Sequence, residues 1–273
     1  MPNACDTVYD MVYSMSFSQK SRGLGLALGS GGAKGAAHIG ALKAFEENNI
    51  TFDYVAGTSI GSVVGALYAK GYSADDMANL VKETGLSDPK RFLFVAAGVR
   101  SLGEGLSRIF GGAEFCDLKK PFCAVATNLD NGEEVDISDG DLASAVAASC
   151  SIQPVFGAVT RNGVRLIDGA FVNSVPANVV KRLGADKVVS INLGKGRDDN
   201  YEIKRILDEV YPENGVEYRV RSKACYENSA VIIEPELERF SSASIGKFDA
   251  MYVAGYESAK AKIDEIKKLY NER

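Results

Sequence analysis

Short apolar runs of strand length alternate along this chain with longer stretches that have the spacing or the small residues of helices. Several helical stretches begin at a capping residue or end at a glycine, which is typical of helix boundaries. Strand-like runs cover residues 23–28, 52–56, 122–129, 133–137, 164–167, 187–193 and 231–233. Helices are predicted over residues 36–47, 62–70, 73–84, 142–150, 175–183, 201–211, 216–226 and 249–270. This alternation predicts an α/β fold with a largely parallel central sheet covered by helices on both faces.

Two local sequences support these boundaries. Ser73 and Asp76 have the spacing of a capping pattern at the start of one predicted helix. Asp130, Asn131 and Gly132 separate two strand-like runs, and Asn-Gly between such runs predicts a β-hairpin.

The chain is long enough for one well-buried core, with 273 residues of which 46% are hydrophobic. Residues 1–22 are weakly patterned and are interpreted as an N-terminal extension. Residues 23–273 form the single predicted domain, with a helical segment at its C-terminal end. Residues 86–112 contain an apolar run and several glycines, which is compatible with a core helix plus a loop and equally with an apolar wall or lid over a site.

The charge balance argues against a nucleic-acid partner, because 31 basic and 36 acidic residues give a net charge of −5 without a basic block. Five cysteines at wide spacings form no zinc pattern and predict free thiols in a reducing compartment. Residues 1–20 lack the apolar core of a signal peptide. The uncharged runs 54–69 and 142–160 are interpreted as buried protein rather than membrane-spanning helices. We therefore expect a cytoplasmic protein.

The sequence Gly57-Thr58-Ser59-Ile60-Gly61 has the form G-x-S-x-G and lies between a strand-like run and a helical one. Strand, tight turn and helix with a serine at the apex form a nucleophile elbow. Residues two before and two after the serine must be small, and here they are Gly57 and Gly61. The start of the helix would direct free N–H groups and the positive end of its dipole towards a developing oxyanion. The motif alone is also compatible with an ordinary βα turn.

A second glycine-rich turn, residues 29–35, joins the first strand to the first helix and exposes backbone N–H groups suited to an anion. A phosphate loop is excluded because Lys34 is followed by Gly35 rather than by serine or threonine. A dinucleotide loop stays open, since Asp53 lies at about the expected distance, although Lys34 stands where the third glycine belongs. We favour an oxyanion hole, because neighbouring βα loops of a parallel sheet share one edge and the next loop carries Ser59.

A serine nucleophile needs a base, and the chain has a single histidine. His38 precedes Ser59, which is the wrong order for an α/β-hydrolase, although another fold could bring the two together. We expect His38 to pack under the glycine loop. Asp168 is the preferred base, because it ends a strand and because a partly desolvated carboxylate within hydrogen-bond reach can accept a serine proton. Asp168-Gly169 is also a common turn sequence.

Taken together and in this order, the motifs resemble those of bacterial patatin-like phospholipases. Ser30-Gly31-Gly32-Ala33-Lys34-Gly35 resembles the family's oxyanion loop, G-G-G-x-[RK]-G. Gly57-Thr58-Ser59-Ile60-Gly61 resembles its G-x-S-x-G, and Asp168-Gly169-Ala170 resembles its D-G-[GA]. Residues 148–156 and 173–176 resemble the segments on either side of the aspartate.

The resemblance, which runs from about residue 23 to residue 193, implies a three-layer α/β/α fold and a lipid acyl hydrolase with a Ser–Asp dyad. Ser59 would be the nucleophile and Asp168 the base. Backbone N–H groups of the glycine loop would hold the oxyanion, and the residues predicted there are Ser30, Gly31, Gly32, Lys34 and Gly35. Ser30 departs from the family, which has glycine at that position. The resemblance implies neither a metal nor a cofactor.

A lipid or another acyl ester is therefore the expected substrate, with hydrolysis and transfer to a second alcohol both open. Contact with a membrane, such as the inner membrane, would be peripheral and apolar, because no basic cluster is present to attract anionic lipid. Two other functions stay under consideration. One is a catalytically silent regulator with the same fold, and the other is a dinucleotide-binding oxidoreductase that uses the glycine loop.

Overall fold

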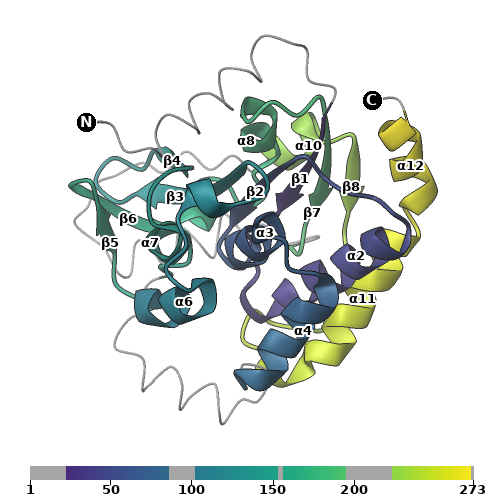
Figure 1. The fold of residues 1–273 in the computed structure, drawn as a ribbon, viewed down its shortest axis with the longest axis horizontal. Helices are drawn as coiled ribbons and strands as arrows, with labels where there is room; N and C mark the ends of the chain where they lie inside the picture. Colours follow the sequence, from purple (N-terminus) through teal and green to yellow (C-terminus); the bar gives the residue numbers. More distant parts are fainter. Residues whose placement is uncertain (1–22, 86–101, 153–155, 195–222, 272–273) are drawn as a thin grey trace.

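The computed structural model describes residues 23–85, 102–152, 156–194 and 223–271 (Figure 1). The predicted N-terminal extension and the helix predicted over residues 201–211 lie outside the described residues. The helix predicted over residues 216–226 lies partly outside them, and its described end belongs to a short helix.

The strands of the described part form one mixed, eight-stranded sheet in the order β5-β6-β3-β2-β1-β7-β8, with β4 also paired to β3. Strands β1, β2, β3, β7 and β8 run parallel to one another, whereas β4 and β6 pair antiparallel with β3 and β5 pairs antiparallel with β6, so the prediction of a largely parallel sheet is confirmed. The strands are β1 Leu24–Leu28, β2 Tyr54–Thr58, β3 Phe122–Asn128, β4 Glu134–Ile137, β5 Val159–Arg161, β6 Val164–Asp168, β7 Lys187–Ile191 and β8 Val231–Ile233.

The described helices follow most of the predicted ranges. Ser73 caps one helix in a capping box with Asp76, and the hairpin between β3 and β4 has Gly132 at a positive φ of 72°, so both local predictions are confirmed. The helices are α2 Ala36–Glu47, α3 Ile60–Lys70, α4 Ala74–Glu83, α6 Leu102–Phe110, α7 Leu142–Ser149, α8 Ala177–Arg182, α10 Ala224–Asn228, α11 Phe248–Lys260 and α12 Ile263–Asn271.

The single C-terminal helix predicted over residues 249–270 is wrong, because the chain forms two helices, α11 and α12. A turn at Ala261 and Lys262 separates them, and α12 buries Ile263 and Ile266 in the core. The apolar residues continue at helical spacing through this turn, so periodicity alone does not reveal the break.

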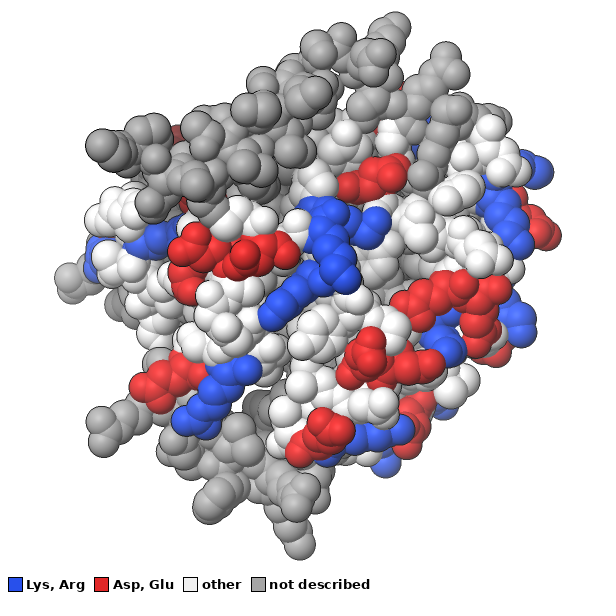
Figure 2. All heavy atoms as spheres, viewed as in Figure 1, with Lys and Arg blue, Asp and Glu red and all other residues white. Residues whose placement is uncertain are grey.

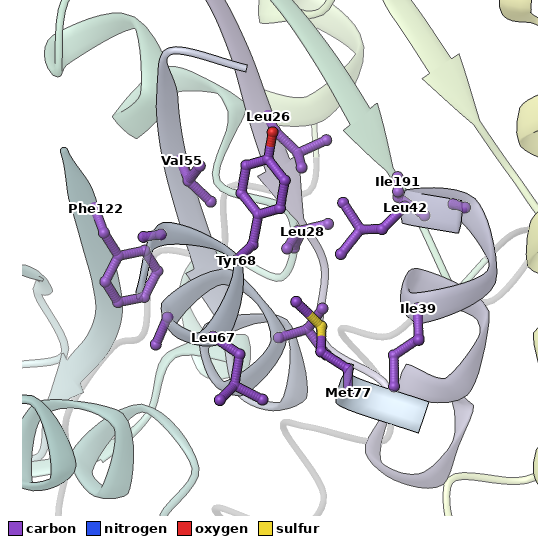
Figure 3. Close-up of a cluster of buried hydrophobic side chains, with 14 of the residues drawn as sticks. Leu26, Leu28, Ile39, Leu42, Val55, Leu67, Tyr68, Met77, Phe122 and Ile191 are labelled. Carbon is purple, nitrogen blue, oxygen red and sulfur yellow. The ribbon is translucent and has the colours of Figure 1, made fainter. Parts of the chain in front are cut away.

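Helices cover both faces of the sheet. Successive side chains of a strand point to opposite faces, so the central strands contribute to two cores. In β1, Leu26 lies in the larger core and Ala27 in the smaller one. The larger core, part of which is drawn in Figure 3, contains buried side chains of α2, α3, α6, α7 and α11. The smaller core is closed by side chains that include Val180 of α8 and Cys225 of α10. The predicted three-layer arrangement is therefore confirmed.

Part of the apolar segment 86–112 belongs to this larger core. Residues 86–101 lie outside the described residues, but α6 follows them and buries Leu106 and Phe110. For residues 102–110, the interpretation as a core helix is therefore confirmed.

Helices α2 and α11 touch through their backbones. A Cβ atom added at Gly40 would overlap the carbonyl oxygen of Tyr252, and one added at Gly255 would overlap the carbonyl oxygen of Ala37. The absence of a side chain at both glycines therefore permits the close crossing seen in Figure 1. This contact fixes α2, whose first turn continues the glycine-rich loop after β1.

On the described part of the face drawn in Figure 2, acidic and basic side chains are interspersed. Among the residues that the structure describes, no helix combines the length and the apolar character that a membrane crossing requires. Cys123, Cys150 and Cys225 are free thiols, but Cys116 is disulfide-bonded, so the prediction of free thiols throughout the chain is wrong at Cys116.

Candidate active site

The glycine loop and the nucleophile elbow lie side by side at one edge of the sheet. Strands β1 and β2 are parallel neighbours and pair Leu28 with Gly57, so the two loops that follow them begin at the same level. A Cβ atom at Gly61 would overlap the Leu28 carbonyl oxygen, and one at Gly35 would overlap the Ile60 side chain. The two loops are therefore packed against each other, as the prediction of a shared site required.

Ser59 occupies the apex of a sharp turn between β2 and α3. Its backbone has φ 54° and ψ −126°, a conformation that non-glycine residues rarely adopt. Strand and helix approach so closely that a Cβ atom at Gly57 would overlap the Gly61 carbonyl oxygen. The predicted nucleophile elbow, with small residues two positions either side of the serine, is therefore present.

Strand β3 brings Ser59 and Asp168 together. It pairs with β2 over residues 122–125 and with β6 over residues 126–128, while β4 pairs with residues 124–127. Because a strand has only two edges, β2 and β6 must share the edge opposite β4, placed end to end. The parallel β2 ends beside the antiparallel β6, so Ser59 and Asp168 meet at the junction, where Ser59 Oγ donates to Asp168 Oδ2 at 2.7 Å.

The Asp168 carboxylate is held in place and is almost completely buried, with 1% of its surface exposed. Its second oxygen accepts the N–H of Ala170 at 2.9 Å, which leaves Oδ2 to face the serine. Its backbone is fixed as well, because its N–H donates to Ser151 O and its carbonyl accepts from Thr127 Oγ1. Burial disfavours the charged carboxylate and raises the pKa of Asp168 to about 6, although both hydrogen bonds oppose this shift.

Two main-chain contacts anchor the glycine loop and determine which of its N–H groups are available. Ser30 N–H donates to Ser174 O at 2.9 Å, and Ala33 N–H donates to Ser242 O at 2.8 Å. Between these anchors, within the described part of the chain, the N–H groups of Gly31 and Gly32 have no hydrogen-bond partner. Gly32 has a positive φ of 56°, which favours glycine. Within this loop, the N–H groups of Gly31 and Gly32 are therefore available to bind an anion.

The other predicted loop residues have supporting contacts. The Ser30 hydroxyl lies 2.6 Å from the Ser174 hydroxyl, so the serine that replaces the family's glycine adds a second link to the main-chain one. Lys34 N–H donates to Gly31 O at 3.2 Å within the 3₁₀ turn Gly32–Gly35. The buried Lys34 side chain places its Nζ 3.4 Å from Leu193 O, just beyond β7.

His38 supports the glycine loop and is not a partner of Ser59. The side chain is fully buried in α2, and its Nε2 lies 2.7 Å from the Gly29 carbonyl oxygen. Because a carbonyl oxygen only accepts, Nε2 carries the proton, and the buried Nδ1 has no hydrogen-bond partner among the residues that the structure describes. Burial lowers the pKa of His38 to about 4, so the ring is neutral at pH 7. The expectation that His38 packs under the glycine loop is confirmed.

A buried polar cluster behind the elbow carried no assigned role in the sequence. Thr58 Oγ1 donates to Asn173 O at 2.8 Å, which links the residue before the nucleophile to the loop after Asp168. Asn173 Nδ2 in turn lies 2.7 Å from Glu134 Oε2, and Arg182 forms an ion pair with the same carboxylate. In the sequence, Asn173 stands out only as a polar residue among small and apolar ones. Its partners Thr58 and Glu134 lie on β2 and β4, far away along the chain.

The chain is similar in sequence to parts of two much longer proteins. The patatin-like phospholipase domain-containing protein 6 of Mus musculus is 29% identical over 309 residues, covering 95% of this chain and 23% of that protein. The lysophospholipase nte1 of Aspergillus fumigatus is 25% identical over 281 residues, covering 90% of this chain and 18% of that protein. The chain thus spans less than a quarter of the length of these two relatives.

The fold is similar to a solved structure, that of VipD from Legionella pneumophila. The TM-score is 0.53 at 14% sequence identity, and the match covers 89% of this chain and 67% of that chain. A family model described as patatin-like phospholipase matches residues 26–181, which is more than half of the sequence and includes the glycine loop, the elbow and Asp168. The chain belongs to the patatin-like phospholipase family.

Proposed function

We propose that this protein hydrolyses acyl esters of phospholipids or lysophospholipids through a Ser–Asp dyad. The observation that carries the proposal is the 2.7 Å hydrogen bond from Ser59 Oγ to the buried Asp168 carboxylate. A serine hydroxyl is a poor nucleophile until a base within hydrogen-bond reach accepts its proton. In this site the carboxylate already lies at that distance.

The proposed reaction begins when Ser59 Oγ attacks the carbonyl carbon of the ester and its proton passes to Asp168 Oδ2. The carbonyl oxygen becomes an oxyanion that the N–H groups of Gly31 and Gly32 stabilise. The carbon–oxygen bond to the alcohol then breaks, and Asp168 returns the proton to the departing alkoxide. Water then attacks the acyl-enzyme as Asp168 accepts its proton. Collapse of the second oxyanion breaks the bond between the acyl carbon and Ser59 Oγ, Asp168 returns the proton to Oγ, and the fatty acid is released.

General magnitudes indicate what each group would contribute. A single oxyanion donor lowers the barrier by about 2.7–4 kcal/mol. General-base assistance contributes about 10²–10⁴-fold in rate. The strained turn at Ser59 costs about 1–3 kcal/mol of folding free energy, which the surrounding contacts must offset. The N-terminus of α3 adds its positive dipole end next to the developing charge.

The substrate class follows from the relatives, whose names describe a lysophospholipase and a patatin-like phospholipase. Such substrates are amphiphiles that assemble into bilayers or micelles, so we also propose that the protein meets them by peripheral contact with a lipid surface. The net charge of −5 and the lack of a basic block favour an apolar contact over attraction to anionic lipid. Co-flotation with neutral vesicles that survives high salt is expected, and binding lost in high salt would contradict this contact mode.

The function is tested by hydrolysis of lysophosphatidylcholine and of nitrophenyl acyl esters. Wild-type protein is expected to release fatty acid, and Ser59→Ala is expected to release none above background. Ser190→Ala is the matched control, because it also removes a buried, hydrogen-bonded hydroxyl but lies in β7. Absence of turnover by wild-type protein on every ester would instead support a catalytically silent member of the family.

A further inference from the structure

The last hydrogen bond between β2 and β3 is replaced by a side chain. Val55 N–H donates to Pro121 O at 3.0 Å, and the two strands keep one parallel register from Val55 to Thr58. Hydrogen bonds of a parallel ladder recur every two residues on each strand. In this register the next donors on β2 would be Gly57 N–H and then Ser59 N–H, and the acceptor expected for Ser59 N–H is Val125 O.

The hydroxyl of Ser149 occupies that final position. Ser59 N–H donates to Ser149 Oγ at 2.9 Å, and Ser149 Oγ donates to Val125 O at 2.6 Å. A hydroxyl has one proton to donate and lone pairs to accept, so it satisfies both backbone groups. Ser149 is the last residue of α7 and is fully buried, which fixes the hydroxyl from a third element.

This insertion separates the nucleophile from the sheet. Two hydrogen bonds through an oxygen atom span more distance than the single bond they replace, so Ser59 leaves the line of β2 at this point. Its backbone adopts φ 54° and ψ −126° there and enters α3. Without the hydroxyl, the part-buried Ser59 N–H and the buried Val125 carbonyl would both lose this hydrogen-bond partner, and the position of Ser59 would no longer be defined from this side.

We propose that Ser149 is a positioning residue for the nucleophile, because its inserted hydroxyl holds the Ser59 backbone in the turned conformation that directs Oγ to Asp168. The inference rests on the proposed function of Ser59. It also means that the Ser59 N–H is committed to Ser149 and is not available to an oxyanion. Ser149 itself contacts neither the substrate nor the reacting atoms.

The test compares Ser149→Thr with Ser149→Val, two variants of nearly equal shape that differ in the hydroxyl. The readouts are kcat, KM and the rate at which a fluorophosphonate probe labels the protein. Threonine is expected to stay within about threefold of wild type, and valine to fall about 10–100-fold below threonine in kcat and labelling rate with KM unchanged, because a 1 Å misplacement costs about 100-fold. Equal rates for the two variants, within about twofold, would overturn the inference.

Two controls keep the outcome interpretable. Near-ultraviolet circular dichroism reports whether each variant is folded, and if valine does not fold, Ser149→Ala is compared with Ser190→Ala. A loss of labelling confined to the Ser149 variant supports the inference, and equal labelling of both variants overturns it. Failure of wild-type protein to label would refute the proposed function of Ser59, whereas wild-type labelling that Ser149 does not affect would refute only the positioning role.

Discussion

Ser59 Oγ and Asp168 Oδ2 lie 2.7 Å apart although 109 positions separate the two residues in the sequence. The contact exists because β2 and β6 occupy the same edge of β3 and end towards each other. Strand β3 supplies no reacting side chain, but its register determines the distance between nucleophile and base. The chemistry of the site therefore depends on the pairing of three strands.

Asp168→Asn is expected to lower kcat by about 10²–10⁴-fold, because the amide has the same shape but cannot accept the serine proton. In wild type, kcat/KM should rise with pH through an inflection near 6, since burial raises the pKa of Asp168 to about 6 and only the ionised form is a base. Initial rates between pH 4.5 and 8 check both statements. A wild-type profile without an inflection in this range, or an asparagine variant with full activity, would contradict the role of Asp168.

The same carboxylate should reduce the stability of the folded protein at neutral pH. Its pKa is about 6 in the folded protein and 3.8 for an unperturbed aspartate, so between these values the folded state binds the proton that the unfolded state has lost. The stability associated with the protonated Asp168 carboxyl is fully present below pH 3.8 and is lost as pH rises through 6. The loss lowers the free energy of unfolding by about 3 kcal/mol. Asp168→Asn should therefore be more stable than wild type at pH 8, with a smaller difference at pH 5. Urea unfolding at pH 5 and pH 8 measures the free energy of unfolding of both proteins. If the stability gained by Asp168→Asn over wild type were smaller at pH 8 than at pH 5, the predicted sign would be wrong.

Gly169 is predicted to tolerate no side chain. A Cβ atom there would overlap the carbonyl oxygen of Val125, so Gly169→Ala must move either β3 or the loop that carries Asp168. We expect a loss of about 1–3 kcal/mol in the free energy of unfolding, as for other overpacked positions, together with a loss of activity. Gly157→Ala is the control, because an added Cβ atom meets nothing within 4 Å there. Equal stability of Gly169→Ala and Gly157→Ala would show that a Cβ atom at residue 169 is accommodated without a clash with β3.

His38 is predicted to affect acid stability and not the activity profile. Its pKa is lowered from 6.5 to about 4 by burial, so the unfolded state binds a proton in this range that the folded state does not. The stability associated with the neutral, buried His38 ring is fully present above pH 6.5. It is lost as pH falls towards 4, where the free energy of unfolding is lower by up to about 3 kcal/mol. His38→Gln keeps an N–H donor for Gly29 O without titrating, so it should lack this loss while its activity inflection stays near pH 6. A changed inflection in the glutamine variant would implicate His38 in catalysis.

The fold class and the turns that carry Ser59 and Asp168 could be predicted from the sequence because both leave local signals. Apolar runs reveal buried strands, and the elbow needs Gly57 and Gly61, whose backbones touch other backbone atoms directly. Asp168 was recognisable as a polar residue at the end of an apolar strand. These features depend on residues close to one another in the sequence.

The contacts that hold the site in position could not be predicted in this way. Ser149 is one small residue in a helix of small residues, and its importance comes from Ser59 and Val125, which lie on separate strands. The sequence also did not reveal which N–H groups of the glycine loop are engaged, since Ser30 N–H donates to Ser174 O from the loop after Asp168. Long-range pairing of this kind becomes visible only when strand order and register are known.

The most direct test of the central claim is to trap the nucleophile and identify it. Purified wild-type protein is treated with a fluorophosphonate, digested and analysed by tandem mass spectrometry, with Ser59→Ala treated in parallel. We expect one phosphonylated residue, Ser59, labelled at a rate that rises with pH through about 6, and no adduct in the alanine variant. An adduct on another residue, or equal labelling of Ser59→Ala, would contradict it.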